Sequence, residues 1–235
     1  GGSGEDMAVA VSADANGKVM VAGSYTGDAT FGGRHLTALG ETDAFVAQWS
    51  AAGECTWLAS EGGRGADYAS SLISTGDGGW LLAGDFEGVA TLGQVNYQSR
   101  GAADVFLVCY RADGIPAWSR TMGGEGPDIG GRIALARNKV IHWTASAGGH
   151  VYMNGQSLVG RGGMDICLAT CSSDGSLLGG RIWGGEQDDL AAGLAVDNRG
   201  NVYLAGSASG RARFDTFTLD SPGPSVGFMM GIKLR

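Results

Sequence analysis

The chain has 235 residues, 43% of them apolar, and a net charge of −8 with no cluster of Lys or Arg. This apolar content excludes a disordered chain, and the acidic charge argues against a nucleic-acid-binding surface. No apolar run approaches the roughly 18 residues of a membrane helix, so we expect no membrane insertion. Glycine is abundant, at 44 residues, but it does not recur at every third position, which excludes collagen.

The N-terminus bears on how the chain is processed, and the four cysteines bear on disulfides and metal binding. The sequence begins in Gly-Gly without a signal peptide, which suggests a mature form or an excised piece. Cys167 and Cys171 lie in one predicted strand, about 13 Å apart, which is farther than the roughly 7 Å that a disulfide tolerates. Cys55 and Cys109 stand at non-equivalent places, and no C-x₂-C pair suggests zinc. We therefore expect buried thiols, with no metal and no cofactor.

The dominant feature is a repeated motif, Gly-Gly-x-x-x-Asp, which occurs four times at a spacing of 61 residues. Its aspartates are Asp6, Asp67, Asp128 and Asp189. A long fixed period is typical of repeat architectures. It divides one domain into the repeats 1–61, 62–122, 123–183 and 184–235.

Each repeat carries signals for four strands. In the first repeat, a strand from Met7 to Ser12 precedes an Asn16-Gly17 turn, which is a strong hairpin signal. The second strand is apolar on both faces and is therefore expected to be buried on both sides. A third strand begins at Asp43, and a fourth follows the turn at Gly53.

The connection between the second and third strands has the same length in each repeat. It carries two apolar residues five positions apart, such as Phe31 and Leu36, which predicts a small hairpin packed against the body. The third repeat deviates in its first turn, Arg137-Asn138-Lys139, which we predict to be one residue shorter with strand pairing kept.

Four short antiparallel strands in each repeat predict an all-β fold, a β-propeller with four blades, or part of a larger propeller. Small residues suit the first strands near an axis, whereas Phe45, Phe106, Trp57 and Trp118 can fill the widening space between blades. The coils of a β-helix are much shorter than 61 residues, and a β-sandwich would need no repeat. The long connections and the Gly-Gly loops share one face, where we expect any ligand.

The Gly-Gly-x-x-x-Asp loop superficially matches the calcium-binding nonapeptide of β-rolls. That motif requires stacking every nine residues, and here the period is 61 residues. We therefore predict a structural role, in which glycine permits positive φ and the aspartates accept backbone N–H bonds.

Several segments resemble a known family. Gly-Asn-Val-Tyr-Leu-Ala-Gly at 200–206 and Asp-Ala-Phe-Val-Ala at 43–47 resemble the bacterial β-propeller repeat family often called SBBP. The NHL-type propeller repeat shares the Gly-Asn-Val-Tyr core. The resemblance covers essentially the whole chain. It implies a propeller from a secreted or surface bacterial protein, with an extracellular, cell-surface or periplasmic location, and it implies no activity.

The last repeat lacks a fourth strand, because residues 232–235 complete only the third. Three explanations stay open: the ring closes with a three-stranded blade, the piece belongs to a longer chain, or another chain adds a strand at the open edge. A protein partner or a neighbouring subunit would occupy that edge in the third case.

The sequence contains no nucleophile elbow, zinc-protease helix or P-loop, and three scattered histidines, His35, His142 and His150. We therefore predict no catalytic residues and a non-catalytic protein-interaction or scaffold module.

A glycan-binding lectin is the alternative. Its candidate ligand residues are Tyr25 and Phe86, which occupy equivalent positions, although Ala147 and Ala208 replace them in the other repeats. An enzyme with a site on the long-connection face is the third hypothesis.

Overall fold

The computed structural model describes residues 1–233, and these contain β-strands in antiparallel sheets and no helix. The final Leu234 and Arg235, which the sequence places at the end of a strand, lie outside the described residues. The chain forms two compact units, one of Gly1–Ser99 with Phe106–Thr121 and the other of Arg100–Val105 with the residues from 122 onward. No helix that could cross a membrane is found in the described chain.

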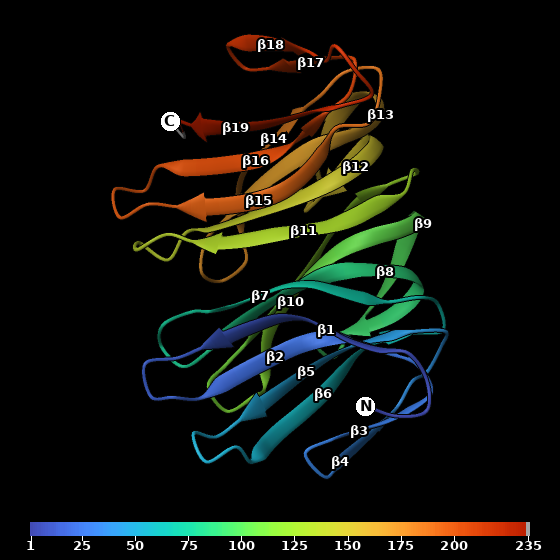
Figure 1. Cartoon of the computed structure of the whole chain (residues 1–235), viewed down its shortest axis with the longest axis vertical. Coiled ribbons are helices and arrows are strands. Elements are labelled where there is room, and N and C mark those ends of the chain that lie inside the picture. The colour runs from blue at the N-terminus through green and yellow to red at the C-terminus, as the bar shows by residue number, and fades with distance from the viewer. Residues whose placement is uncertain (234–235) are drawn as a thin grey trace. The chain divides into compact units, whose positions relative to one another are not determined.

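The first three repeats contribute to one 12-stranded sheet, which short pairings between successive repeats hold together. The first repeat supplies the order β1-β2-β5-β6 and a separate hairpin, β3-β4 (Figure 1). Its strands are β1 (Asp6–Ala13), β2 (Val19–Tyr25), β3 (Asp28–Phe31), β4 (Arg34–Thr37), β5 (Asp43–Trp49) and β6 (Cys55–Gly63). Apart from the hairpin β3-β4, strands that follow one another in the chain are therefore neighbours in the sheet, as the repeat pattern predicts.

The second repeat gives the order β7-β8-β9-β10. Its strands are β7 (Tyr68–Ser74), β8 (Trp80–Leu92), β9 (Val95–Tyr110) and β10 (Pro116–Gly124). The middle of β9 and the end of β10 belong to the second unit.

The second unit also holds the third and fourth repeats (Figure 1). The third repeat pairs β11 (Asp128–Leu135), β12 (Ile141–Met153), β13 (Gln156–Cys171) and β14 (Leu177–Trp183) in chain order. The fourth repeat forms a three-stranded sheet and a hairpin, from β15 (Leu190–Val196), β16 (Val202–Ala208), β17 (Arg211–Phe214), β18 (Phe217–Asp220) and β19 (Val226–Ile232).

The predicted hairpins in the long connections are confirmed. In the first and fourth repeats they are the separate pairs β3-β4 and β17-β18. In the third repeat the hairpin continues β12 and β13 without interruption, so that Met153 pairs with Gln156 across the turn. The turn residues Asn154 and Gly155 both have positive φ, as the tight hairpin turns that match strand twist require.

The prediction of a shorter first turn in the third repeat is wrong. Leu135 pairs with Ile141, just as Ala13 pairs with Val19 in the first repeat, so both turns have the same length. Lys139 takes the left-handed position, with φ of 63°, where the other repeats have glycine. The sequence suggested a deletion because the expected glycine is missing, whereas the backbone tolerates a strained lysine there.

The packing of β2 against β5 explains a repeated glycine. Gly23 pairs with Phe45, and a Cβ atom on Gly23 would lie 2.7 Å from the Phe45 ring. Gly84 is equally close to the ring of Phe106. A carbonyl oxygen of the first strand is closer still, at 1.9 Å from the Cβ position of Gly23 and 2.0 Å from that of Gly84. In the third repeat a smaller residue, Cys167, stands opposite an alanine. Glycine therefore makes room for the first-strand backbone and for the phenylalanine ring of the third strand.

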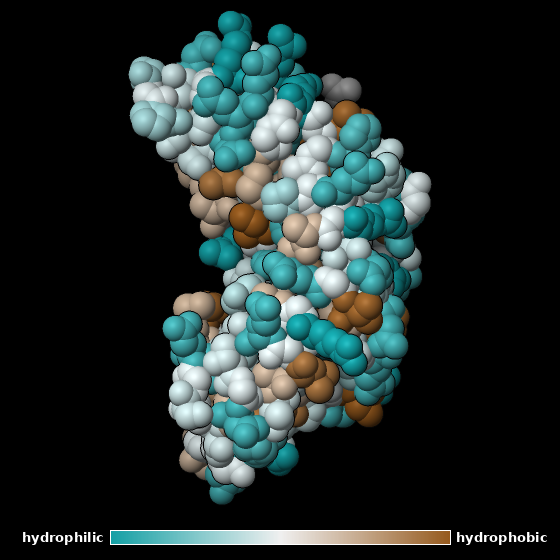
Figure 2. Space-filling model, turned by 90° about the vertical axis from the view of Figure 1, so that its right-hand side faces the viewer, coloured by the Kyte–Doolittle hydropathy of each residue, from teal (hydrophilic) through white to brown (hydrophobic). Residues whose placement is uncertain are grey.

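Large apolar side chains fill the interior of both units, led by Trp80, Phe106 and Trp143, which are fully buried. On the face shown in Figure 2, hydrophobic residues form separate patches among hydrophilic ones. The four cysteines are free thiols, and Cys167 and Cys171 are buried.

Candidate functional site

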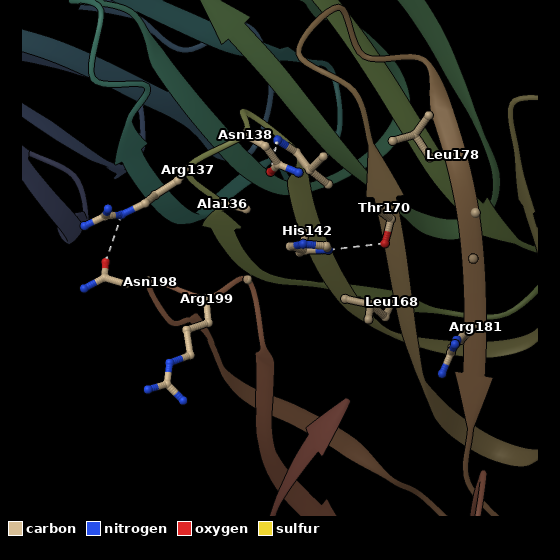
Figure 3. Close-up of a pocket in the computed structure, with 14 residues that line it drawn as sticks. Ala136, Arg137, Asn138, His142, Leu168, Thr170, Leu178, Arg181, Asn198 and Arg199 are labelled. Carbon is tan, nitrogen blue, oxygen red and sulfur yellow. Dashed lines mark hydrogen bonds between the residues drawn. The ribbon is translucent and has the colours of Figure 1, made fainter. Parts of the chain in front are cut away.

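The second unit contains a pocket of about 640 Å³ (Figure 3), a size that suits a small ligand. It lies between the third and fourth repeats, at the strand ends joined by the short turns. Its lining consists of Ala136, Arg137, Asn138, Val140 and His142, of Leu168 and Thr170 on β13, of residues 178–181 on β14, and of the turn residues 198–200.

A glycine on β14 leaves this space open. Gly179 stands at the repeat position that Trp57 and Trp118 occupy in the first two repeats. A Cβ atom built on Gly179 would have no heavy atom within 4 Å. In the first unit, by contrast, the Trp57 indole packs edge-on against Tyr110, with ring centroids 5.3 Å apart. The pocket therefore exists where the third repeat lacks the tryptophan that its equivalents use for packing.

The charged side chains that line the pocket are arginines. Arg137, Arg181 and Arg199 line it, and none of its described lining residues is acidic. Arg181 forms an ion pair of 2.7 Å with Asp215, which lies outside the lining. Arg137 donates from Nε to the neutral amide oxygen of Asn198, at 3.2 Å, so this contact leaves its charge uncompensated.

His142 forms the polar floor of the pocket together with Thr170. Its ring points toward the threonine in Figure 3, with Nδ1 3.2 Å from Oγ1. Burial lowers the pKa of His142, so that the ring is neutral at pH 7 and the positive charge of the pocket comes from its arginines. The equivalent residues in the first two repeats are Met20 and Leu81. A polar residue has therefore replaced an apolar one where the pocket opens.

The sequence did not predict this pocket. We expected a ligand on the face of the long connections, whereas the pocket lies beside the short turns 136–140 and 197–200. Two signals were present in the sequence: Gly179 where other repeats have tryptophan, and His142 in an otherwise apolar strand. Neither predicts a cavity without knowledge of which side chains pack together.

The two predicted ligand residues, Tyr25 and Phe86, are both completely buried, with 0% exposure. The Tyr25 ring packs edge-to-face against Phe31 and Phe45, and its hydroxyl lies 2.8 Å from Ser60 Oγ. Phe86 belongs to the main core cluster of the first unit. In this structure the two rings fill the interior, and neither offers an aromatic surface to a ligand from solvent.

The histidines do not form a common site. His35 is exposed and lies 3.5 Å from Asp28, His150 is exposed on β12, and His142 lines the pocket. Among residues 1–233, no three His, Cys, Asp or Glu side chains are placed to hold a metal ion.

The repeated aspartates have the structural role that we predicted. Each accepts an N–H bond from the second glycine of its own motif, at 2.6 Å for Asp6 and Asp67 and at 2.7 Å for Asp128 and Asp189. The last three are buried and accept a second N–H from the start of the following connection, such as that of Glu87 on Asp67, at 3.2 Å.

A second buried aspartate accompanies three of these motif aspartates. Burial is the main cause that raises the pKa of Asp67 and of Asp128, and the neighbouring Asp43 and Asp104 raise them further. The pKa values of Asp67 and Asp128 are raised to about 7. Oδ1 of Asp43 has no hydrogen-bond partner within the described chain. The motif aspartates fix the loops between repeats by hydrogen bonds, and burying their charged form is unfavourable.

The edge of the fourth sheet differs from the other three. In the first three repeats the third strand has neighbours on both sides, whereas within residues 1–233 β19 pairs with β16 alone.

The chain matches no family model, and comparison with curated proteins gives no match. Its resemblance to the bacterial β-propeller repeats therefore depends on the motifs quoted above.

Proposed function

We propose that the chain is a non-catalytic protein-interaction module whose repeat sheets are the blades of a β-propeller of the SBBP type. The support is a 61-residue sequence period combined with a group of antiparallel strands for each repeat, in chain order. A β-bulge also recurs at the same place in every first strand, after Ala8, Ala69, Gly130 and Ala191. A location in a secreted or surface bacterial protein is part of the same proposal.

The observation that carries the interaction role is the exposure of β19. Met229 is 78% exposed, whereas the residues at the same position in the other repeats, Val46, Leu107 and Leu168, are at most 1% exposed. The unpaired edge and this exposed side chain belong to the same strand. Exposed sheet edges pair readily with another strand, and strand addition is an established mode of peptide recognition.

We propose that an extended strand from outside the described residues pairs with this edge, here a strand of a partner protein. The third repeat gives the geometry of such a complex, because β14 runs antiparallel to β13 from Ile166↔Trp183 to Cys171↔Leu177. A strand added to β19 would pair with its backbone in the same way along Val226–Ile232. Main-chain hydrogen bonds would provide the affinity, and alternate side chains would provide the selectivity.

A peptide titration tests this proposal. A fluorescent peptide with the sequence of β10, residues 116–124, is titrated with the chain and followed by anisotropy, with a scrambled peptide as control. Only alternate amides of an antiparallel strand face a given neighbour. We therefore expect N-methylation of one alternating set of amides to abolish binding and methylation of the other set to preserve it.

Equal binding of native and scrambled peptides, or of both N-methylated sets, would refute strand addition, and so would the absence of binding. Light scattering across a concentration series gives an independent result. Self-association that the peptide displaces would assign the edge to a second copy and contradict the partner assignment.

A further inference from the structure

We propose that the pocket between the third and fourth repeats binds a small acidic saccharide, a sugar that carries a carboxylate or sulfate group. This inference goes beyond the interaction role, because it concerns other residues and a ligand of another class. The site lies within the second unit, and none of the residues argued below belongs to β19.

The pocket is built by departures from the repeat pattern. Gly179 removes the tryptophan, and His142 replaces an apolar residue. The turn contributes a third change, because Ala136 stands where the first and fourth repeats have Asp14 and Asp197. Those aspartates cap their own turns through backbone N–H groups. The third repeat thus loses a carboxylate at the place where the pocket opens.

The charge of the pocket selects an anion. Three arginines line it in a chain whose net charge is −8. The ion pair with Asp215 compensates the charge of Arg181, so the charge offered to a ligand is that of Arg137 and Arg199. The contact of Arg137 with Asn198 engages only Nε, so the terminal nitrogens of this guanidinium are not used by it. A guanidinium matches the geometry of carboxylate and sulfate oxygens through paired N–H donors.

The uncharged lining suits hydroxyl groups. Asn138, Asn198, Thr170 and the neutral His142 can all donate or accept hydrogen bonds, and they line the same pocket as the arginines. The lining contains no Phe, Tyr or Trp among its described residues. A nucleobase therefore has no stacking surface here, and a neutral sugar would lack the aromatic face that usually holds it. A polyol with an anionic group satisfies both parts of the lining.

Isothermal titration at low salt tests the proposal with glucuronate, glucose and inorganic sulfate as probes. We expect glucuronate to bind at least tenfold more tightly than glucose or sulfate, and its affinity to fall as salt screens the arginines. Arg137→Ala and Arg199→Ala should each weaken glucuronate binding about tenfold. Arg213→Ala, an exposed arginine outside the pocket, should leave it unchanged.

Gly179→Trp provides a second test, because it restores the residue of the first two repeats. The variant should abolish glucuronate binding at an unchanged melting temperature, since space is open at this position. Equal affinity for glucose and glucuronate would overturn the proposal, as would sulfate binding as tightly as glucuronate. Binding that survives both arginine substitutions would place the ligand elsewhere and also overturn it.

Discussion

Asp67→Ala tests the structural role of the repeated motif. The carboxylate of Asp67 accepts two backbone N–H bonds, from Gly63 at 2.6 Å and from Glu87 at 3.2 Å. Alanine provides neither acceptor, and Asp67 is fully buried, so water does not readily replace it. The substitution therefore leaves two donors unsatisfied in the loop between repeats.

Each unsatisfied buried donor costs about 1–3 kcal/mol. Removal of a desolvated carboxyl beside Asp43 offsets part of this cost. We expect a net loss of about 3 kcal/mol, which corresponds to a melting temperature lowered by about 6–12 °C in a chain of this size. Because burial raises the pKa of Asp67 to about 7, the folded chain is more stable when this carboxyl is protonated. The loss should therefore be larger at pH 5 than at pH 8.

Differential scanning calorimetry measures the change, with Asp6→Ala as the matched control. Asp6 accepts the same bond from Gly2 at 2.6 Å but is exposed, so water can replace it and the melting temperature should hardly move. An Asp67→Ala protein with wild-type stability would refute the reasoning, and so would an equal loss in both variants. Glucuronate binding should be unchanged by Asp67→Ala, because Asp67 is remote in sequence from the pocket lining and belongs to the other unit.

Three further predictions concern stability. The pKa values of Asp67 and Asp128 in the folded chain, about 7, lie above their unfolded values, so their contribution is greatest below about pH 4 and is lost as the pH rises through 7. Chemical unfolding at pH 5.5 and pH 8 should show lower stability at pH 8, and a flat or rising profile would contradict this. Lys139→Gly should raise the free energy of unfolding by about 0.5–1 kcal/mol, since glycine adopts the positive φ of this position without strain. A free energy of unfolding below that of the wild type in urea titrations would count against strain there. Gly84→Ala should lower the free energy of unfolding by about 2–3 kcal/mol, because its Cβ would lie 2.0 Å from the Tyr68 carbonyl oxygen. Gly179→Ala should leave the stability unchanged. Similar melting temperatures for both variants would disprove the packing argument.

The repeat architecture was readable from the sequence because it depends on local chemistry. The Asn16-Gly17 turn needs only the conformational freedom of its own residues, and the motif aspartates reach glycines four positions away. The long connections formed hairpins for the same reason, and in the first three repeats two adjacent turn residues have positive φ. Even so, the missing glycine at Lys139 suggested a deletion that the strand register does not contain.

Long-range packing decided what the sequence could not. Tyr25 and Phe86 occupy equivalent positions, but only the hairpins and strands packed around them determine that both rings are buried. The pocket is likewise a property of two repeats together, because an absent tryptophan becomes a cavity only when nothing else fills its place. The sequence by itself determined the repeat, its turns and its hydrogen-bonded loops. The tertiary structure alone decided which apolar residues are covered and which, like Met229, are exposed, because burial depends on contacts between segments that are distant along the chain.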